Sequence, residues 1–180
     1  IFYSELNKDG FDQDLVSSFF SNLIFDVDEN FEVTDTGIAT LAVDVPNKKV
    51  TIKIKDNMKW SDGQPVVADD VIYAYEVLGN KDYTGIRYND ESTKIVGMEE
   101  YHAGKTPNIS GIKKVDDKTV EITFKQLGQG IYTATTNGLL RYALPKHYLQ
   151  DVPIKDLEKS ELIRSKVVTL GAYSISNSVQ

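Results

Sequence analysis

Residues 59–71 read Lys-Trp-Ser-Asp-Gly-Gln-Pro-Val-Val-Ala-Asp-Asp-Val, and this stretch decides the fold assignment. We expect a strand that ends in the large aromatic Trp60, followed by a turn at 61–63 in which the glycine can take a positive φ. Pro65 then precedes the next helix. We also expect Trp60 to fill the core beneath the turn, because an indole of this size contributes most when it is buried.

Alternating hydrophobicity on both sides of this stretch predicts two strands. Apolar and polar residues alternate over 50–54 and again over 120–124. Long alternation with one polar face is typical of antiparallel sheets, so the two strands are predicted to be partners or near neighbours. Asp116-Asp117, just before the second strand, predicts a hairpin turn.

Helical patterns occupy much of the remaining chain. Residues 69–78 have apolar side chains on one side and Asp69-Asp70 at the positive N-terminal end, as in a short helix that ends at Gly79-Asn80. Further predicted elements are helices at 14–24, within 91–103, at 143–149 and at 154–163, and a strand at 172–175.

The composition disfavours several classes of function. The chain has 180 residues, 41% of them hydrophobic, a formal net charge of −7 and no cysteine. A negative chain is a poor nucleic-acid binder, because that affinity comes mostly from Lys and Arg. The absence of cysteine excludes disulfides and thiol chemistry. No run reaches the roughly 18 apolar residues of a membrane span, so we expect any export signal or anchor to lie outside this sequence.

The quoted stretch resembles the signature of the peptide- and nickel-binding family of extracellular solute-binding proteins, in which a strand runs into a Trp-Ser-Asp-Gly-x-Pro-x-Thr-Ala-x-Asp-Val pattern. Further matches follow along the chain, and in their order and spacing they are most similar to the oligopeptide-binding branch of Gram-positive bacteria. These matches are Gly-Met-Glu-Glu-Tyr at 97–101 with Ala-Gly-Lys at 103–105, Ser-Gly-Ile at 110–112 before Val-Asp-Asp-Lys-Thr-Val-Glu-Ile at 115–122, Leu-Pro-Lys-His-Tyr-Leu at 144–149, and Gly-Ala-Tyr-Ser-Ile at 171–175.

One position departs from the pattern of the family. Val67 stands where relatives usually have Thr, and it cannot accept a hydrogen bond from the free N–H groups at the start of the helix. The lost cap is expected to cost about 1 kcal/mol. Asp69 and Asp70 are expected to offset part of this cost through the helix dipole.

The resemblance implies an α/β (α+β) fold, a fragment of the periplasmic-binding-protein-like class II fold, with a mixed sheet and flanking helices. Relatives have two lobes that close over the ligand and an extra domain inserted near the N-terminus. On this basis residues 1–42 are expected to form an edge segment of the first lobe, 43–138 the inserted domain, and 139–180 the return segment into the first lobe. The missing initiator Met and the ending at Gln180 also suggest a piece of a longer protein, whose second lobe lies outside this chain.

The resemblance further implies the substrate-binding component of an ABC-type oligopeptide importer. Its expected partners are oligopeptides and, in the full-length protein, the ABC permease subunits. It would work at the extracellular face of the membrane, lipid-anchored through a segment outside this chain, without a cofactor and without nucleic acid. Because binding relies on closure between lobes, this chain alone is predicted to bind peptide weakly or not at all.

Candidate peptide contacts lie in two polar segments. Amphipathic aromatic side chains suit a peptide cleft, although loop tyrosines also commonly pack on the surface of their own domain. The candidate residues are Tyr83, Arg87, Tyr88 and Asn89 in one loop, and Asn137 and Gly138 in the other segment.

Other functions remain open as alternatives. The same family includes nickel binders, but His102 and His147 lie in different segments without the spacing of metal ligands. A surface peptide sensor or adhesin is another alternative. Adjacent carboxylates at 69–70, 99–100 and 116–117 are normally solvated charges, and no phosphate loop or nucleophile elbow is present, so no enzyme is predicted.

Overall fold

The computed structural model describes residues 3, 6, 23–30, 32–128 and 140–170. The predicted strand at 172–175 lies outside these residues, as does most of the helix predicted at 14–24. The last two residues of that helix are described, and they are not helical. Leu23 instead forms an isolated antiparallel bridge with Tyr142, which joins an early segment of the chain to a late one.

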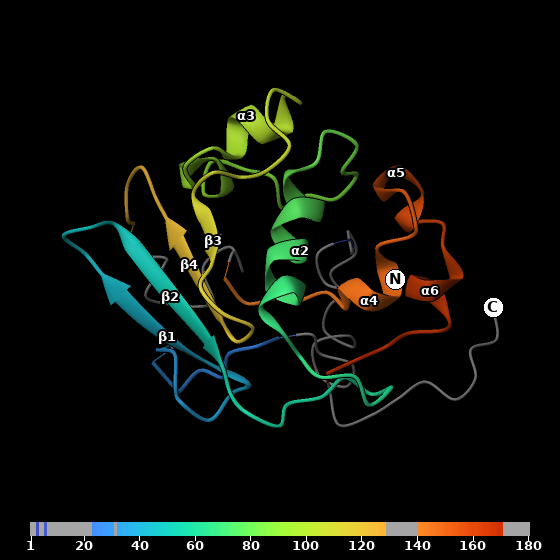
Figure 1. Cartoon of the computed structure of the whole chain (residues 1–180), viewed down its shortest axis with the longest axis horizontal. Coiled ribbons are helices and arrows are strands. Elements are labelled where there is room, and N and C mark those ends of the chain that lie inside the picture. The colour runs from blue at the N-terminus through green and yellow to red at the C-terminus, as the bar shows by residue number, and fades with distance from the viewer. Residues whose placement is uncertain (1–2, 4–5, 7–22, 31, 129–139, 171–180) are drawn as a thin grey trace.

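A four-stranded sheet forms one side of the molecule, with the strand order β1-β2-β4-β3 (Figure 1). All the described strand pairings are antiparallel, so this sheet is not the mixed one that was expected. Val50 lies opposite Ile122 and Ile52 opposite Val120, which confirms the predicted pairing of the two alternating segments. The strands are β1 (Ala39–Asp44), β2 (Lys49–Ile54), β3 (Ile112–Lys114) and β4 (Thr119–Thr123).

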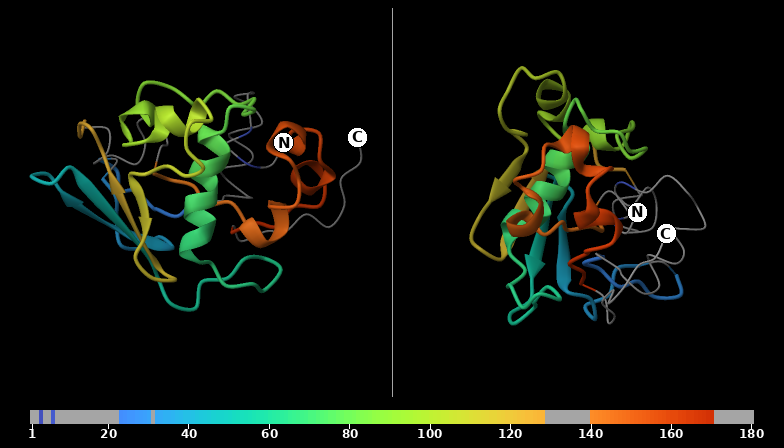
Figure 2. Two further views of the ribbon diagram at one scale, coloured as in Figure 1. Left: turned by 45° about the horizontal axis from the view of Figure 1, so that its top comes forward. Right: turned by 90° about the vertical axis from the view of Figure 1, so that its right-hand side faces the viewer.

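Helix α2 (Ala68–Gly79) lies between two hydrophobic clusters. Val71, Tyr75 and Leu78 pack into the cluster that contains the buried residues of β2 and β4. Tyr73 and Val77 belong to the second cluster, on the side of the helices near the C-terminal end of the described chain (Figure 2). The predicted helix at 69–78 is therefore confirmed, but it is buried against both sides rather than along one face.

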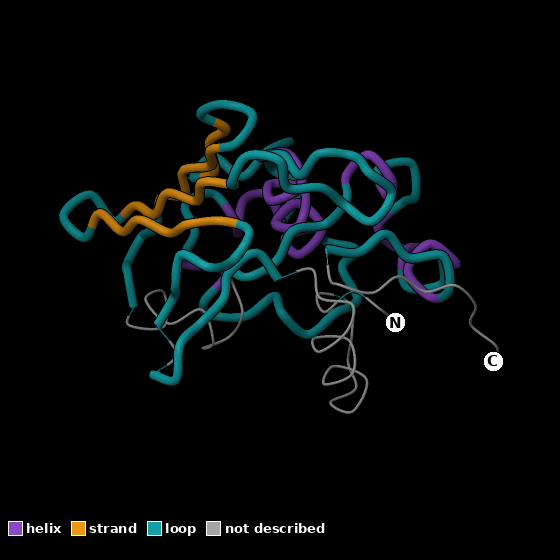
Figure 3. Tube along the Cα trace, turned by 90° about the horizontal axis from the view of Figure 1, so that it is seen from below, coloured by secondary structure: helices purple, strands orange, loops and turns teal. Residues whose placement is uncertain are grey.

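Three single-turn helices form the other side of the second cluster. They are α4 (Lys146–Leu149), α5 (Ile154–Leu157) and α6 (Glu161–Arg164). The segment 154–163, predicted as one helix, is thus divided in two, because Ser160 starts a new turn and its hydroxyl accepts a hydrogen bond from the Leu162 N–H. Figure 3 shows the strands gathered at one side of the molecule and the helices beside them.

The predicted helix within 91–103 is also divided, into the 3₁₀ turn η1 (Ser92–Lys94) and helix α3 (Met98–His102). Gly97 separates them with a φ of 80°. A β-carbon at this position would lie 2.6 Å from the backbone nitrogen of Ser110. Both the left-handed backbone and the close approach of residue 110 therefore require glycine here.

Within the described ranges, none of the helices has the length and the hydrophobicity that a membrane crossing requires.

Candidate functional site

The turn that follows Trp60 closes on itself through backbone hydrogen bonds. The Trp60 N–H donates to the Gln64 carbonyl at 2.8 Å, and the Gly63 N–H donates to the Trp60 carbonyl at 2.9 Å. Gly63 has the predicted positive φ, at 87°. The prediction that a strand runs up to Trp60 is wrong, because β2 ends at Ile54. Nearer to Trp60 there is only an isolated bridge between Lys59 and Pro65.

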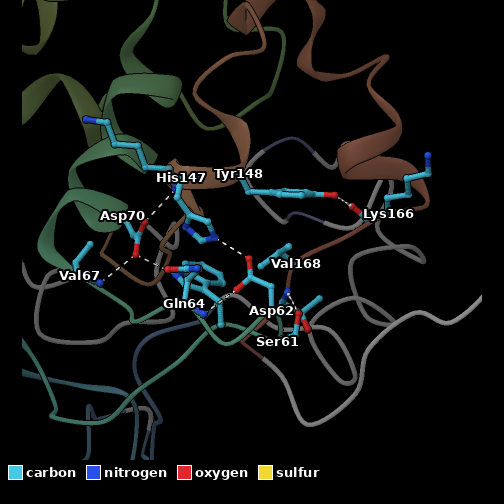
Figure 4. A network of polar contacts seen from close by, with 12 residues as sticks. Ser61, Asp62, Gln64, Val67, Asp70, His147, Tyr148, Lys166 and Val168 are labelled. Atoms are coloured by element: carbon cyan, nitrogen blue, oxygen red, sulfur yellow. Dashed lines mark hydrogen bonds and ion pairs between the residues drawn. The ribbon is translucent and has the colours of Figure 1, made fainter.

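Trp60 is buried, as predicted, with 2% of its surface exposed. Its indole is not merely a hydrophobic plug, because Nε1 donates a hydrogen bond of 2.9 Å to Oδ2 of Asp70. The same oxygen accepts a hydrogen bond from the Val67 N–H at 3.0 Å, and Oδ1 accepts one from the Lys146 N–H at 3.0 Å. Figure 4 shows the dashed contacts that leave this carboxylate, one of them to Val67. Asp70 thus joins three chain segments that are up to 76 residues apart.

The Asp70 contact also revises the expected capping of α2. Val67 is the N-cap, with φ −131° and ψ 165°, and its aliphatic side chain offers no acceptor. The Asp70 carboxylate, three residues later, satisfies the Val67 N–H directly. This is the half of a capping box that the N3 side chain supplies, so Asp70 contributes a specific hydrogen bond and not only the dipole effect that was expected.

Burial dominates the electrostatics of Asp70. Only 1% of the residue is exposed, and this burial raises the pKa of its carboxyl above the usual range. The three N–H hydrogen bonds and the nearby His147 oppose the rise, because they favour the ionised form. The group is thus a buried carboxylate whose direct hydrogen-bond partners are neutral N–H groups.

A second set of contacts ties the same turn to the end of the described chain. Ser61 and Thr169 exchange two hydrogen bonds, from the Ser61 N–H to the Thr169 carbonyl and from the Thr169 N–H to the Ser61 hydroxyl. His147 Nε2 lies 2.8 Å from Oδ2 of Asp62, and the two side chains point toward one another in Figure 4. The turn is therefore held by both α4 and the segment that follows α6.

The pKa of the Asp62 carboxyl lies below its usual range. Partial burial raises this pKa, but the hydrogen bonds from His147 and from the Gln64 N–H outweigh the burial. Both members of the Asp62–His147 pair keep about a third of their side chain exposed, at 30% and 34%. The contact is thus a partly screened tie at the surface rather than a buried ion pair.

A cavity of about 410 Å³ lies beside this network, where the start of α2 faces α4. It is lined by Gln64, Pro65, Val67, Asp69, Asp70, Lys146, His147 and Gln150. The charged groups at its edge already have partners, since Asp69 pairs with Lys114 and His147 with Asp62. These contacts connect the Trp60 turn and the start of α2 to α4 and to Thr169, and we call this contact region the joint.

The four predicted contact residues in the 83–89 loop contact other residues of the chain. The Arg87 N–H lies 3.4 Å from the Tyr83 hydroxyl, and the Arg87 guanidinium lies over the Tyr142 ring, 5.2 Å from its centre. Tyr88 stacks on His102, with ring centres 3.9 Å apart. Asn89 accepts hydrogen bonds from the N–H groups that begin η1, including that of Glu91 at 2.9 Å.

The structure therefore places Tyr83 and Arg87 together, and Tyr88 and Asn89 in separate contacts of the same loop. Their role as peptide contacts stays a prediction. Asn137 and Gly138 lie outside the described residues.

Among the described residues, neither histidine has a cluster of potential metal ligands around it. His102 Nδ1 is 3.0 Å from the Gly79 carbonyl, at the end of α2, whereas His147 faces Asp62. In the part of the chain that the structure describes, no group of three or more His, Asp or Glu side chains could hold a metal ion.

The sequence predicted a turn above a buried Trp60, but for Asp70 it predicted only an effect on the helix dipole and not these hydrogen bonds. One signal was available, because Asp70 lies three residues after the N-cap position, where an acidic side chain can reach back to the N-cap N–H. The contact with Lys146 had no local signal, since its two residues are 76 positions apart.

Comparison with known proteins gives a consistent assignment. Residues 36–180 match the model of the bacterial extracellular solute-binding proteins, family 5 Middle. The oligopeptide-binding protein OppA of Lactococcus lactis subsp. cremoris is 35% identical over 159 residues, which cover 87% of this chain and 26% of that protein. The oligopeptide-binding protein AppA of Bacillus subtilis is 32% identical over 68% of this chain and 19% of its own length. The chain thus spans about a quarter or less of the length of these curated relatives.

Solved structures agree with the sequence matches. Lactococcal OppA, complexed with an endogenous peptide in the closed conformation, superposes with a TM-score of 0.91 at 32% identity, covering 99% of this chain and 34% of that one. AppA from Bacillus subtilis, in complex with a nonapeptide, superposes with a TM-score of 0.77 at 27% identity, covering 99% of this chain and 32% of that one. These likenesses confirm the expected fold class. Because the family model matches most of its length, the chain belongs to the bacterial extracellular solute-binding proteins, family 5.

Proposed function

We propose that the full-length protein is the substrate-binding component of an ABC-type oligopeptide importer, which captures extracellular peptides and delivers them to the permease. The observation that carries the proposal is the likeness of this chain, over 99% of its length, to lactococcal OppA solved with a peptide. The relatives by sequence are also oligopeptide-binding proteins. Because the chain corresponds to about a third of the solved relative, the activity is proposed for the whole protein.

The proposal includes the organisation of the chain. Residues 1–42 and 139–180 would belong to the first lobe, and residues 43–138 would form the inserted domain. The joint between the 60–70 turn and the 144–169 segment would then connect the inserted domain to the first lobe. The protein would act at the outer face of the membrane, held by a lipid anchor outside this chain, and would bind peptides without hydrolysing them.

Calorimetry on two proteins tests the central claim. The full-length protein and the 180-residue chain are each titrated with a mixture of short peptides. We expect the full-length protein to bind with a dissociation constant in the micromolar range or tighter, and the 180-residue chain to bind at least about 100-fold more weakly, because it cannot close over the ligand. A full-length protein that binds no peptide contradicts the proposed function, whereas tight binding by the 180-residue chain contradicts only the need for a second lobe.

Three further experiments separate the alternatives. Mass spectrometry of the peptides after incubation detects new termini if the protein is a hydrolase, and we expect none. Addition of nickel should leave peptide binding unchanged, since the described residues offer no cluster of metal ligands. Loss of peptide uptake after deletion of the permease genes would distinguish import from sensing or adhesion.

Matched substitutions test the proposed contacts in the full-length protein. Arg87→Ala and Asn89→Ala are expected to weaken peptide binding several-fold. Arg164→Ala in α6 and Asn47→Ala in the β1–β2 turn serve as controls, because they remove the same side chains from other regions. Equal effects of each substitution and its control would remove these residues from the proposed contacts. Tyr83 and Tyr88 are tested as phenylalanine and alanine variants, which separate the hydroxyl from the ring.

A further inference from the structure

The Asp70 carboxylate lies where the first residues of two helices meet. Val67 is the N-cap of α2, and Lys146 is the first residue of α4. Oδ2 accepts from the Val67 N–H and Oδ1 accepts from the Lys146 N–H, each at 3.0 Å. One side chain therefore satisfies backbone donors at the beginnings of both helices, donors that have no partner within a helix of their own.

The backbone of Asp70 strengthens the same joint. The Leu144 N–H donates to the Asp70 carbonyl at 3.1 Å, two residues before the contact with Lys146. Residues 144–146 are thus bound twice by one residue of α2. Helix α4 has only four residues, too few to be stable alone, so its position depends on such contacts.

We propose that Asp70 is a positioning residue, a shared cap that fixes α4 on α2 and holds residues 144–149 against the Trp60 turn. The joint forms part of the cavity wall, since Asp70, Lys146 and His147 all line the cavity. Trp60 reports on the joint, because its Nε1 donates to the same carboxylate and it is the only tryptophan of the chain.

Several charged groups surround Asp70 and must be separated from it in any titration. Asp62 comes from the Trp60 turn, Asp69 from α2 itself, and Lys146 and His147 from α4. Lys114 comes from the end of β3, and Asp117 and Lys118 come from the turn that follows it. The pKa of Asp62 lies below the usual range and that of Lys114 above it, whereas burial moves the pKa of Asp70 upward. Since His147 contacts Asp62 and also acts on Asp70, each titration is repeated with His147→Gln.

The first test uses the unaltered chain. The NMR resonances of the Trp60 indole N–H and of the Val67 and Lys146 amides are followed between pH 3 and 7, with Trp60→Phe used to assign the indole. All three are expected to shift with one common midpoint above about 4, the usual value for Asp. Different midpoints for the three groups, or no shift of the Lys146 amide, would overturn the proposal.

Two substitutions of Lys146 test the hydrogen bond that its N–H donates to Oδ1 of Asp70. Lys146→Pro removes the N–H, and proline is tolerated at the first position of a helix, whereas Lys146→Ala removes only the charged side chain. Loss of one N–H donor disfavours the ionised form, so Lys146→Pro should move the indole midpoint upward by about half a pH unit or more relative to Lys146→Ala. Equal midpoints in the two variants would contradict the role of this hydrogen bond.

Substitution of the carboxylate completes the test. Asp70→Asn should abolish the indole titration, whereas Asp69→Asn, which alters an exposed neighbour paired with Lys114, should retain it. A titration that persists in Asp70→Asn would assign it to another group and overturn the proposal. If Asp70→Asn does not fold, the common midpoint in the unaltered chain and the Lys146 pair still decide the outcome.

Discussion

Nε1 of Trp60 donates a 2.9 Å hydrogen bond to Oδ2 of Asp70, and both side chains are almost completely buried. A buried donor that loses its partner retains the full cost of its removal from water. Asp70→Ala leaves three N–H groups without their acceptor and is expected to lower the free energy of unfolding by about 3 kcal/mol or more. Urea unfolding followed by circular dichroism measures this change. Asp69→Ala is the control, and its expected loss is below about 1 kcal/mol because the Asp69–Lys114 pair is at the surface.

The Asp62–His147 contact predicts part of the acid sensitivity of the chain. Because the pKa of Asp62 is lower in the folded protein, its stabilising contribution is present above the unfolded pKa of about 4 and is lost as the pH falls through the folded pKa. Asp62→Asn should therefore reduce stability at pH 6 by no more than about 1 kcal/mol and make the acid loss shallower. Urea midpoints measured from pH 6 to pH 2 test this, with the exposed Asp56→Asn as the control. An unchanged acid slope in Asp62→Asn would contradict the role of the contact.

Tyr73 predicts an alkaline transition. Its burial in the second hydrophobic cluster, together with the charges of Glu76 and Asp151, raises the pKa of its hydroxyl to about 12. Because the pKa of Tyr73 is raised in the folded state, the contribution of its neutral hydroxyl to stability is complete below the unfolded pKa of about 10. This contribution is lost as the pH rises toward 12. Tyr73→Phe should move the midpoint of alkaline unfolding to higher pH. Tyr88→Phe, at a partly exposed tyrosine, should move it less, and the reverse order would contradict the prediction.

Two left-handed glycines form a natural comparison. Gly97 and Gly104 have φ values of 80° and 70°, so alanine at either position is expected to cost roughly 1–2 kcal/mol in backbone strain. A β-carbon at Gly104 meets open space, whereas one at Gly97 would meet the backbone nitrogen of Ser110 at 2.6 Å. Gly97→Ala should therefore destabilise the chain by about 1–3 kcal/mol more than Gly104→Ala, as an overpacked core residue does. Thermal and urea unfolding of both variants measure the difference, and equal losses would show that Ser110 moves aside freely.

Elements with strong local patterns were predictable. The pairing of 50–54 with 120–124 follows from alternation, and the burial of Trp60 follows from its size beside a polar turn. The boundaries of elements were less accurate where one residue changes the course of the chain. Gly97 interrupts the predicted 91–103 helix, and Ser160 begins a new helix inside 154–163. In both cases the hydrophobic period continues across a break that depends on backbone geometry.

The loop at 83–89 shows a different limit. Its polar and aromatic composition is compatible with either a ligand contact or a self-packed loop. Arg87 reaches Tyr142, and Tyr88 reaches His102 in α3. Both contacts join the loop to residues in other parts of the chain, so the composition of the loop alone could not predict them.

The sequence by itself determined the family, through the Trp60–Val71 stretch and the ordered matches that follow it, and it determined that a glycine turn would place Trp60 in the core. These are local properties, since they depend on neighbouring residues and on the periodicity of side chains. Only the tertiary structure decided that this turn is a joint, because the partners of Asp70 and Asp62 are Lys146 and His147, 76 and 85 residues away. Such contacts exist only after the chain has closed a long loop, so local pattern cannot reveal which buried carboxylate will hold two helices together.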